Sequence, residues 1–299
     1  MNDRVLQISK ILADVTGDAK IHVSSVEDCE GGCISKAQRI ELNDGREYFL
    51  KSNESDNAET MFATEAAGLA ALGAVNAIRV PHLIHQGRLA DGSDILLLEC
   101  IRSERPSQNF FQAFGERLAQ LHRNGVSTQY GWQMENFIGA SPQFNTWLDS
   151  WVEFFRVHRL EAQHRMLEQR GLATPDLTRR LERLSEKLGE LLAVDDLQPS
   201  LLHGDLWNGN FLCSTNQEPV VFDPAVYYGH REAELSLPVL FGGFPPVFWD
   251  AYQATWPLET GWRDRVEIYK LYHLLNHLLL FGGGYYDDCL RVLERFTWS

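Results

Sequence analysis

The fold of this chain is decided by the stretch Leu202-His203-Gly204-Asp205-Leu206-Trp207-Asn208-Gly209-Asn210, which is followed by Val220-Val221-Phe222-Asp223-Pro224. An Asp stands two residues after a His, an Asn stands five residues after that Asp, and a second Asp ends a β-branched, apolar run. Transfer of a phosphoryl group from ATP needs a carboxylate at the acceptor hydroxyl, and an amide and a second carboxylate at the metal ions. The complete set in this order predicts a kinase-like phosphotransferase.

Three side chains of this stretch have expected catalytic roles. Asp205 is expected to accept the proton of the acceptor hydroxyl, or at least to orient that hydroxyl. Asn210 belongs to the same catalytic set and, together with Asp223, is expected to bind metal. Mg²⁺ fits this pair because it prefers oxygen ligands and substrate phosphates.

Two other residues of the loop are candidates for the substrate side. Trp207 stands two residues past Asp205, where the flat face of an indole suits the C–H face of a sugar or a cationic amine. The alternative is a Trp that packs beneath the loop. His203 is a candidate substrate contact, with hydrogen bonds that brace the loop backbone as the favoured alternative.

Two features of the N-terminal third predict a nucleotide site. Gly31, Gly32, Cys33 and Ile34 lie between two predicted strands, where glycines let backbone N–H groups approach phosphate oxygens. A plain β-turn is the alternative for this segment. Lys51 ends a strand-like run, from which a lysine reaches the α- and β-phosphates.

A helix predicted at about residues 59–72 supplies a partner for that lysine. Glu65 lies within about 60° of the apolar face of this helix, since helical residues advance by about 100° each. A carboxylate on such a face needs a partner, because burial of an unpaired charge is costly; the alternative is a side chain that reaches water. Glu99, Cys100 and Ile101 end the last predicted strand, and their backbone is expected to bind the adenine.

The order of predicted elements indicates two lobes. Two β-rich hairpins with Asp-Gly turns flank the helix at 59–72, and a further helix is expected at 3–16. Beyond residue 101 helical patterns dominate, at 108–123, 144–170, 175–193, 246–255 and 262–281, with short strands at 211–213 and 220–222. We predict an α+β, two-lobed protein-kinase-like fold. A small N-lobe at 1–100, a five-stranded antiparallel sheet with one helix, binds ATP, and a larger, mainly helical C-lobe at 101–299 carries catalysis and substrate binding.

The composition limits the classes of partner that this protein is expected to bind. The formal net charge of −14 argues against nucleic acid and against anionic membranes, because no basic face is available for phosphates. No apolar run approaches the roughly 20 residues that a spanning helix needs. Five cysteines without a repeating spacing favour reduced thiols in a cytoplasmic protein.

Other chemistry-bearing residues favour structural roles. His273 and His277 are spaced for zinc on a helix, but no third ligand accompanies them in the sequence. Gly282, Gly283 and Gly284 favour the end of a helix, with a loop over the acceptor as the alternative.

Together these motifs resemble the fructosamine-3-kinase, or ketosamine-3-kinase, family over nearly the whole chain. Besides the catalytic stretch, the resemblance lies in these segments: Glu30-Gly31-Gly32-Cys33-Ile34, Tyr130-Gly131, Asn136-Phe137-Ile138-Gly139, Trp151-Val152-Glu153-Phe154-Phe155, Tyr228-Gly229-His230-Arg231-Glu232, Phe241-Gly242-Gly243-Phe244 and Phe281-Gly282-Gly283-Gly284-Tyr285. The catalytic stretch alone is shared with aminoglycoside and choline kinases. Trp207 and the other segments are what distinguish the fructosamine-3-kinase family from those kinases.

The resemblance implies ATP-dependent phosphorylation of the sugar 3-hydroxyl of a ketosamine, which is the adduct of a sugar with a free amine or a protein lysine. The labile 3-phosphate then eliminates and frees the amine, so such enzymes act in deglycation, and microbial relatives often prefer ribulosamines. Two alternatives stay open. One is a kinase for another hydroxyl acceptor, such as an aminoglycoside or choline, and the other is a nucleotide-binding pseudokinase without turnover.

The resemblance also bears on assembly. A monomer is expected, but some relatives carry a redox-sensitive cysteine at the position of Cys33 that links two chains. The plain alternative is a free thiol, since cytosolic disulfides are uncommon.

Overall fold

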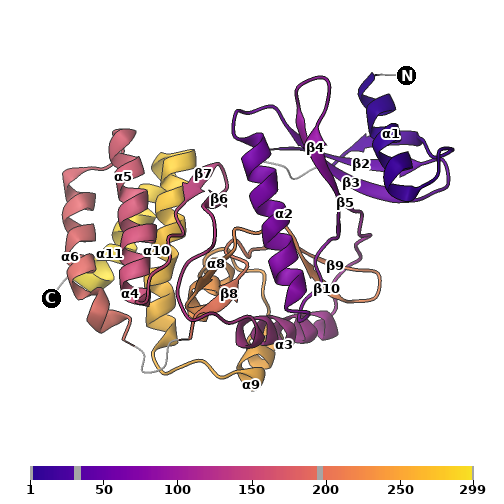
Figure 1. Ribbon diagram of the computed structural model, residues 1–299. Helices are drawn as coiled ribbons and strands as arrows, with labels where there is room; N and C mark the ends of the chain where they lie inside the picture. Colours follow the sequence, from indigo (N-terminus) through magenta and orange to yellow (C-terminus); the bar gives the residue numbers. More distant parts are fainter. Residues whose placement is uncertain (1–2, 30–34, 194–197, 298–299) are drawn as a thin grey trace.

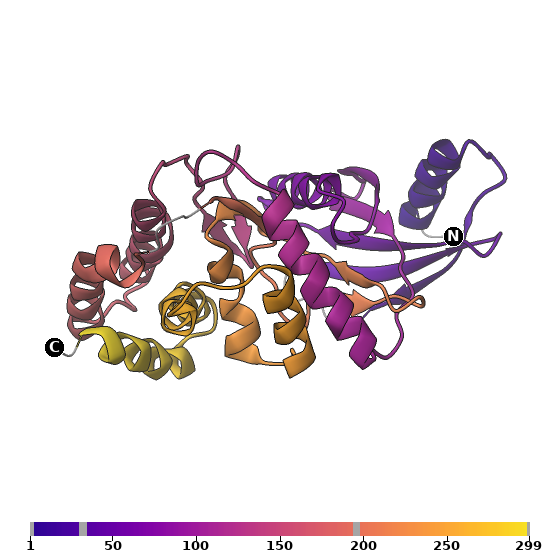
Figure 2. The ribbon, with the colours of Figure 1, turned by 90° about the horizontal axis from the view of Figure 1, so that it is seen from below.

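The computed structural model describes residues 3–29, 35–193 and 198–297. It consists of a part built on a β-sheet and a larger, mainly helical part, and the chain termini lie at opposite ends of the molecule (Figure 1, Figure 2). This arrangement confirms the predicted α+β, two-lobed architecture.

The sheet is fully antiparallel, with the strand order β1-β2-β3-β5-β4. Its strands are β1 (Val23–Asp28), β2 (Lys36–Leu42), β3 (Glu47–Asn53), β4 (Leu83–Arg88) and β5 (Asp94–Glu99). Gly45 and Gly92 have φ of 84° and 90°, a left-handed conformation that suits glycine, in the two predicted Asp-Gly turns. The five-stranded sheet and both hairpins are therefore as the sequence predicted.

Two helices pack on this sheet, α1 (Asp3–Thr16) and α2 (Ala58–Ala74). Leu50 of β3 shares a core with side chains of α1, whereas Leu96 and Leu98 of β5 share a core with side chains of α2. Because successive strand residues face opposite sides, Lys51 is directed to the side of α2. The sheet part thus holds the predicted helix at 3–16 in addition to the one helix assigned to the lobe.

The helical part contains most of the remaining chain. Its α-helices are α3 (Gln108–Asn124), α4 (Trp151–Phe154), α5 (Ala162–Gln169), α6 (Pro175–Leu191), α7 (Arg231–Glu234), α8 (Ser236–Phe241), α9 (Pro246–Thr255), α10 (Trp262–Phe281) and α11 (Tyr286–Thr297). A π-helix, η1 (Phe155–Glu161), joins α4 to α5, and a 3-10 turn, η2 (Gly283–Tyr285), joins α10 to α11.

The helix predicted at 144–170 is wrong at its start. Helix begins only at Trp151, where the Ser150 hydroxyl accepts a hydrogen bond from Glu153 N. The preceding residues are extended because their backbone pairs elsewhere: Trp132 N donates to Asn145 O at 2.8 Å, and Leu148 N donates to Tyr130 O at 2.9 Å. The aromatic residues of this segment have the spacing of a helix in the sequence, but the segment does not form one. The helix α11 was not predicted.

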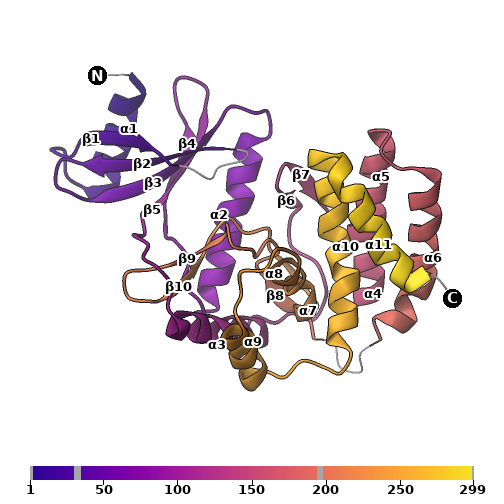
Figure 3. The ribbon, with the colours of Figure 1, turned by 180° about the vertical axis from the view of Figure 1, so that it is seen from behind.

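Three short strand pairs sit between the sheet and the long helices, and Figure 3 shows β8, β9 and β10 in this central position. The pairs are β6 (Asn136–Ile138) with β7 (Ser141–Gln143), β8 (Ser200–Leu202) with β11 (Tyr227–Gly229), and β9 (Phe211–Cys213) with β10 (Pro219–Val221). The strand predicted at 211–213 is confirmed, and the one predicted at 220–222 lies one residue earlier. The loop after β8 carries Asp205 and Asn210, and the loop after β10 carries Asp223.

In the described part of the chain, every helix is too short or too polar to cross a membrane.

Candidate active site

The loop between β8 and β9 holds Asp205 and Asn210 side by side. The Asn210 side-chain amide donates to the backbone carbonyl of Asp205 at 2.7 Å and to its carboxylate Oδ2 at 3.0 Å. Burial raises the pKa of Asp205 well above its usual range, against the opposing effect of the Asn210 amide. The loop thus presents a carboxylate that is partly withdrawn from water and fixed by its neighbour.

Glycine is required at the start of this loop. Gly204 has φ of 83°, and a Cβ at this position would lie 2.0 Å from the backbone oxygen of Ala225. The turn therefore brings the backbone before Asp205 directly against the segment that follows Asp223.

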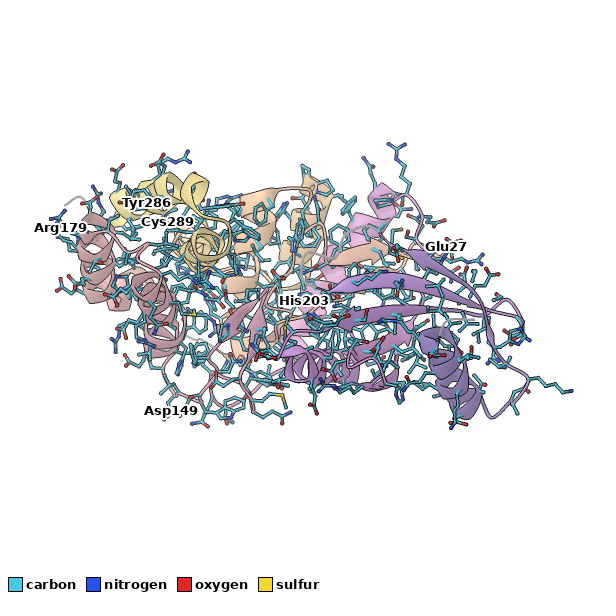
Figure 4. All side chains as sticks on the ribbon, turned by 90° about the horizontal axis from the view of Figure 1, so that it is seen from above. Glu27, Asp149, Arg179, His203, Tyr286 and Cys289 are labelled. Atoms are coloured by element: carbon cyan, nitrogen blue, oxygen red, sulfur yellow. The ribbon has the colours of Figure 1, made fainter. Side chains whose placement is uncertain are left out.

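His203 occupies the interior of this turn, and Figure 4 places it in the middle of the molecule. Its ring is fully buried, Nε2 lies 2.9 Å from the backbone oxygen of Phe222, and Nδ1 accepts from the backbone N–H of Asp205 at 3.3 Å. Burial lowers the pKa of this histidine, which fits a neutral ring that donates from Nε2. These contacts match the bracing alternative, since no face of the ring is open to a substrate.

The segment after β10 brings a second carboxylate to the same place. Asp223 has φ of 56°, a conformation unusual for a residue other than glycine and often held at functional sites. Backbone hydrogen bonds fix it on both sides: Phe222 N donates to Asn210 O at 3.1 Å, and Ala225 N donates to His203 O at 2.8 Å. Asp223 therefore stands beside the loop that carries Asp205 and Asn210.

Lys51 links the sheet to this segment. Its Nζ lies 2.6 Å from Oε2 of Glu65 on α2 and 2.9 Å from Oδ1 of Asp223. Burial lowers the pKa of Lys51, but the two carboxylates raise it further, so the ammonium stays charged. The predicted Lys51–Glu65 pair is confirmed, and the same ammonium also contacts Asp223.

The oxygens left open fit a magnesium ion. The carboxylate of Asp223 is about two-fifths exposed, and only Oδ1 is taken by Lys51. Asn210 uses its amide nitrogen for Asp205, which leaves the amide oxygen. Among the described residues no group of three or more His, Cys, Asp or Glu could hold a metal. Two protein oxygens nevertheless suit Mg²⁺, because this ion is usually bound by one or two carboxylates plus phosphates and waters.

The expected nucleotide contacts are only partly described. Gly31, Gly32, Cys33 and Ile34 lie outside the described residues, so their role stays a prediction. Glu99 ends β5, as predicted, and its side chain pairs with Arg79 at 2.6 Å. The half-buried Cys100 and Ile101 follow directly, at the connection between the sheet and the helical part.

Next to Asp205 an aromatic surface borders the site. Trp207 is 38 % exposed, its ring centre lies 5.9 Å from that of Phe241, and Phe241 lies 5.3 Å from His277. His277 in turn lies 5.6 Å from Phe281 and 5.0 Å from Tyr285. We refer to these five rings as the aromatic wall. The exposed indole of Trp207 contradicts the alternative in which it packs beneath the loop.

Two glycines make this wall possible. A Cβ on Gly209 would lie 2.4 Å from the Trp207 ring, so the indole lies directly over the loop backbone. Gly282, with φ of 79°, ends α10 as predicted, and the chain then returns Tyr285 to the rings of His277 and Phe281. The sequence pointed to Trp207, but the contributions of Phe241 and His277 were missed.

Glu234 was also missed. Its buried carboxylate accepts hydrogen bonds from the backbone N–H groups of both His203 and Gly204, just before Asp205. His122, also fully buried, approaches the same carboxylate at 3.6 Å. The available signal was a carboxylate directly before the apolar run that begins at Leu235, because a buried charge requires a partner.

This fold and this constellation define a protein-kinase-like phosphotransferase, an ATP-dependent enzyme that acts on an alcohol group. The chain belongs to the fructosamine kinase family, whose model matches residues 5–298. Two relatives support this membership. It is 40 % identical to a Synechocystis protein named "Probable ketoamine kinase", over 96 % of this chain and 95 % of the relative. It is 37 % identical to a chloroplastic protein-ribulosamine 3-kinase of Oryza sativa, over 92 % of this chain and 79 % of the relative.

Solved structures agree with this family. A Haemophilus somnus protein named "Putative fructosamine-3-kinase" superposes with a TM-score of 0.87 at 28 % identity, with 99 % of this chain and 100 % of that chain covered. The aminoglycoside phosphotransferase APH(4)-Ia has a TM-score of 0.64 at 14 % identity, with 97 % and 96 % covered, which shows a shared fold alone.

Proposed function

We propose that this protein phosphorylates the sugar 3-hydroxyl of ketosamines, with ribulosamine and fructosamine adducts of amines or protein lysines as substrates. The observation that carries this proposal is the aromatic wall beside Asp205, since flat rings suit a sugar face joined to a cationic amine. The relatives named as ketoamine and ribulosamine kinases support the same substrate class.

The proposed reaction is an in-line transfer. Asp205 takes the proton of the 3-hydroxyl, the hydroxyl oxygen bonds to the γ-phosphorus of ATP, the bond from that phosphorus to the β–γ bridging oxygen breaks, and ADP leaves. Lys51, held by Glu65, binds the α- and β-phosphates. Asn210 and Asp223 would hold Mg²⁺, which neutralises phosphate charge when it is bound. His203 we now assign as a positioning residue, because its buried ring braces the loop.

The nucleotide would lie against the segment around Gly31, Gly32, Cys33 and Ile34, with its adenine at the backbone of Glu99, Cys100 and Ile101. In this proposal residues 1–100 form the ATP-binding lobe and residues 101–299 the catalytic lobe. A monomeric state, a Cys33-linked dimer under oxidising conditions and a cytoplasmic location stay predictions. The four described cysteines are free.

An ATP-consumption assay tests the proposal with ribulosyl-lysine, fructosyl-lysine, an aminoglycoside and choline as acceptors. Turnover is expected on the two ketosamines, and phosphorylation at the 3-hydroxyl is checked by NMR of the product. Asp205→Asn should lower turnover by at least about 100-fold, as for a positioned base. Activity confined to the aminoglycoside or choline would overturn the substrate class, and near-wild-type turnover of Asp205→Asn would overturn the role of that residue.

A further inference from the structure

A groove lies outside the reaction site, at one end of the helical part. It has a volume of about 480 Å³ and is formed by α5, the last turn of α10 and the β6–β7 hairpin, with Phe144, Met166 and Leu280 in its lining. The three elements meet at the upper end of the helical part in Figure 1. Ligand sites typically have volumes of about 300–1,000 Å³, so this groove has room for a few side chains.

The groove and the aromatic wall share the last turn of α10. Leu280 lines the groove, and the next residue, Phe281, belongs to the wall and is 63 % exposed. Both lie on the last turn of α10, which Gly282 ends. The groove therefore begins within one helical turn of the wall, within reach of a substrate that is larger than a sugar on an amine.

The charged side chains that line the groove are both positive. Arg165 and Arg170 both line it, although the formal net charge of the protein is −14. The Arg165 side chain is 53 % exposed, and its guanidinium lies 3.8 Å from the carboxylate of Glu161. The Arg170 side chain is exposed, and within the described ranges no hydrogen bond or ion pair engages its guanidinium. Two available guanidinium groups favour a ligand with carboxylates.

Exposed apolar side chains stand before and after the hairpin that forms one side of the groove, and one of them, Phe144, lines the groove. Met134, Phe144 and Trp147 are 36 %, 36 % and 37 % exposed, and all three flank the β6–β7 hairpin. The Trp147 ring centre lies 6.0 Å from that of Tyr228, so the indole is supported by a neighbour. Exposed aromatic and Met side chains beside a charged rim are typical of surfaces that bind polypeptides.

We propose that this groove binds the polypeptide segment that flanks a glycated lysine, and that it favours a segment with acidic residues. The proposal rests on the ketosamine kinase function. In a protein substrate the sugar lies at the end of a lysine side chain, so the sugar would occupy the aromatic wall and the backbone of its neighbours the groove. A free ribulosyl amine would occupy the wall alone.

Steady-state kinetics with three acceptors test this proposal. They are a heptapeptide whose ribulosylated lysine is flanked by Asp residues, the same peptide with Asn in place of Asp, and free ribulosyl-lysine. For the wild type we expect kcat/KM to be about 3- to 10-fold higher for the Asp peptide than for the Asn peptide, as for two exposed ion pairs. The double variant Arg165→Glu/Arg170→Glu should remove or reverse this preference and leave kcat/KM for free ribulosyl-lysine within about two-fold.

Two further variants sharpen the test. Arg123→Glu/Arg183→Glu changes the same charge at exposed arginines on α3 and α6, outside the groove, and should keep the preference. Phe144→Gln should raise KM for both peptides and not for free ribulosyl-lysine. Equal kcat/KM on the Asp and Asn peptides, or the same loss of the Asp preference in both double variants, would overturn the proposal that the groove binds the flanking polypeptide. A wild type that turns over none of the three acceptors would instead overturn the ketosamine kinase function.

Discussion

Replacement of Glu234 by Gln tests whether a buried carboxylate holds the catalytic loop. In the native chain its two oxygens accept from the N–H groups of His203 and Gly204, the latter at 3.0 Å. Gln offers one acceptor oxygen and turns an NH₂ group towards the other N–H, so one buried donor loses its partner. Such a loss costs about 1–3 kcal/mol. We expect the free energy of unfolding to fall by about 2 kcal/mol, which lowers the Tm of a 299-residue chain by about 3 °C.

The same change should slow the reaction. His203 and Gly204 directly precede Asp205, and a displacement of about 1 Å at a reacting group costs about 100-fold in rate. We therefore expect kcat to fall about 10- to 100-fold, with KM for ATP within about two-fold, because Lys51 and Glu65 do not contact Glu234. The assay is ATP consumption with saturating ribulosyl-lysine, combined with thermal unfolding of the same preparations.

Glu232→Gln is the matched control. Glu232 is equally buried, but its two oxygens bind Arg265 at 2.7 Å each and do not reach the loop. This variant should lose at least as much stability, because it weakens a buried ion pair, yet kcat of the folded enzyme should stay within about three-fold. A Glu234→Gln enzyme with wild-type kcat, or the same kcat loss in both variants, would refute the reasoning.

Two other substitutions test the two sides of the loop. Gly204→Ala forces a Cβ to 2.0 Å from the Ala225 backbone oxygen at φ of 83°, so we expect a lower Tm and at least about a 100-fold loss of kcat; a variant with native Tm and turnover would show that the turn can relax. Trp207→Ala should raise KM for ribulosyl-lysine about 30-fold while KM for ATP stays within about two-fold, and Trp207→Phe, which keeps a ring, should lose less than about five-fold. Unchanged acceptor KM in Trp207→Ala would remove this residue from the acceptor site.

The phosphoryl-transfer half of the site could be predicted because its residues are close in sequence or fixed by strand and helix periods. Asp205 and Asn210 share one loop, and Lys51 faces α2 because strand residues alternate between the two sides of the sheet. The pairing of Glu65 with Lys51 could be predicted because a carboxylate on an apolar helix face needs a partner. The contact of Lys51 with Asp223 joins residues far apart in the chain, and no local pattern reports it.

The rest could not be predicted because tertiary contacts override local pattern. Residues 144–150 have a helical spacing of aromatic side chains, but Asn145 O already accepts from Trp132 N, and a segment paired in this way cannot form a helix. The aromatic wall combines Trp207 with rings from α8, α10 and η2, so only the packed chain defines it. Glu234 was visible as a carboxylate next to an apolar run, but the groups that it binds were not.

The two halves of the site are held by interactions of different kinds, and this difference has a consequence for specificity. Asp205 is fixed through directional hydrogen bonds from Asn210 and through the buried carboxylate of Glu234 on the backbone before it. Apart from Trp207, which lies on the loop itself, the aromatic wall consists of rings at or near helix ends, where Gly242 and Gly282 stop α8 and α10. Hydrogen-bonded backbone tolerates little change, whereas rings at helix ends can be exchanged without moving the loop. A fold shared with an aminoglycoside phosphotransferase at 14 % identity is therefore compatible with a different acceptor, because in our proposal the acceptor is selected by the half that can vary.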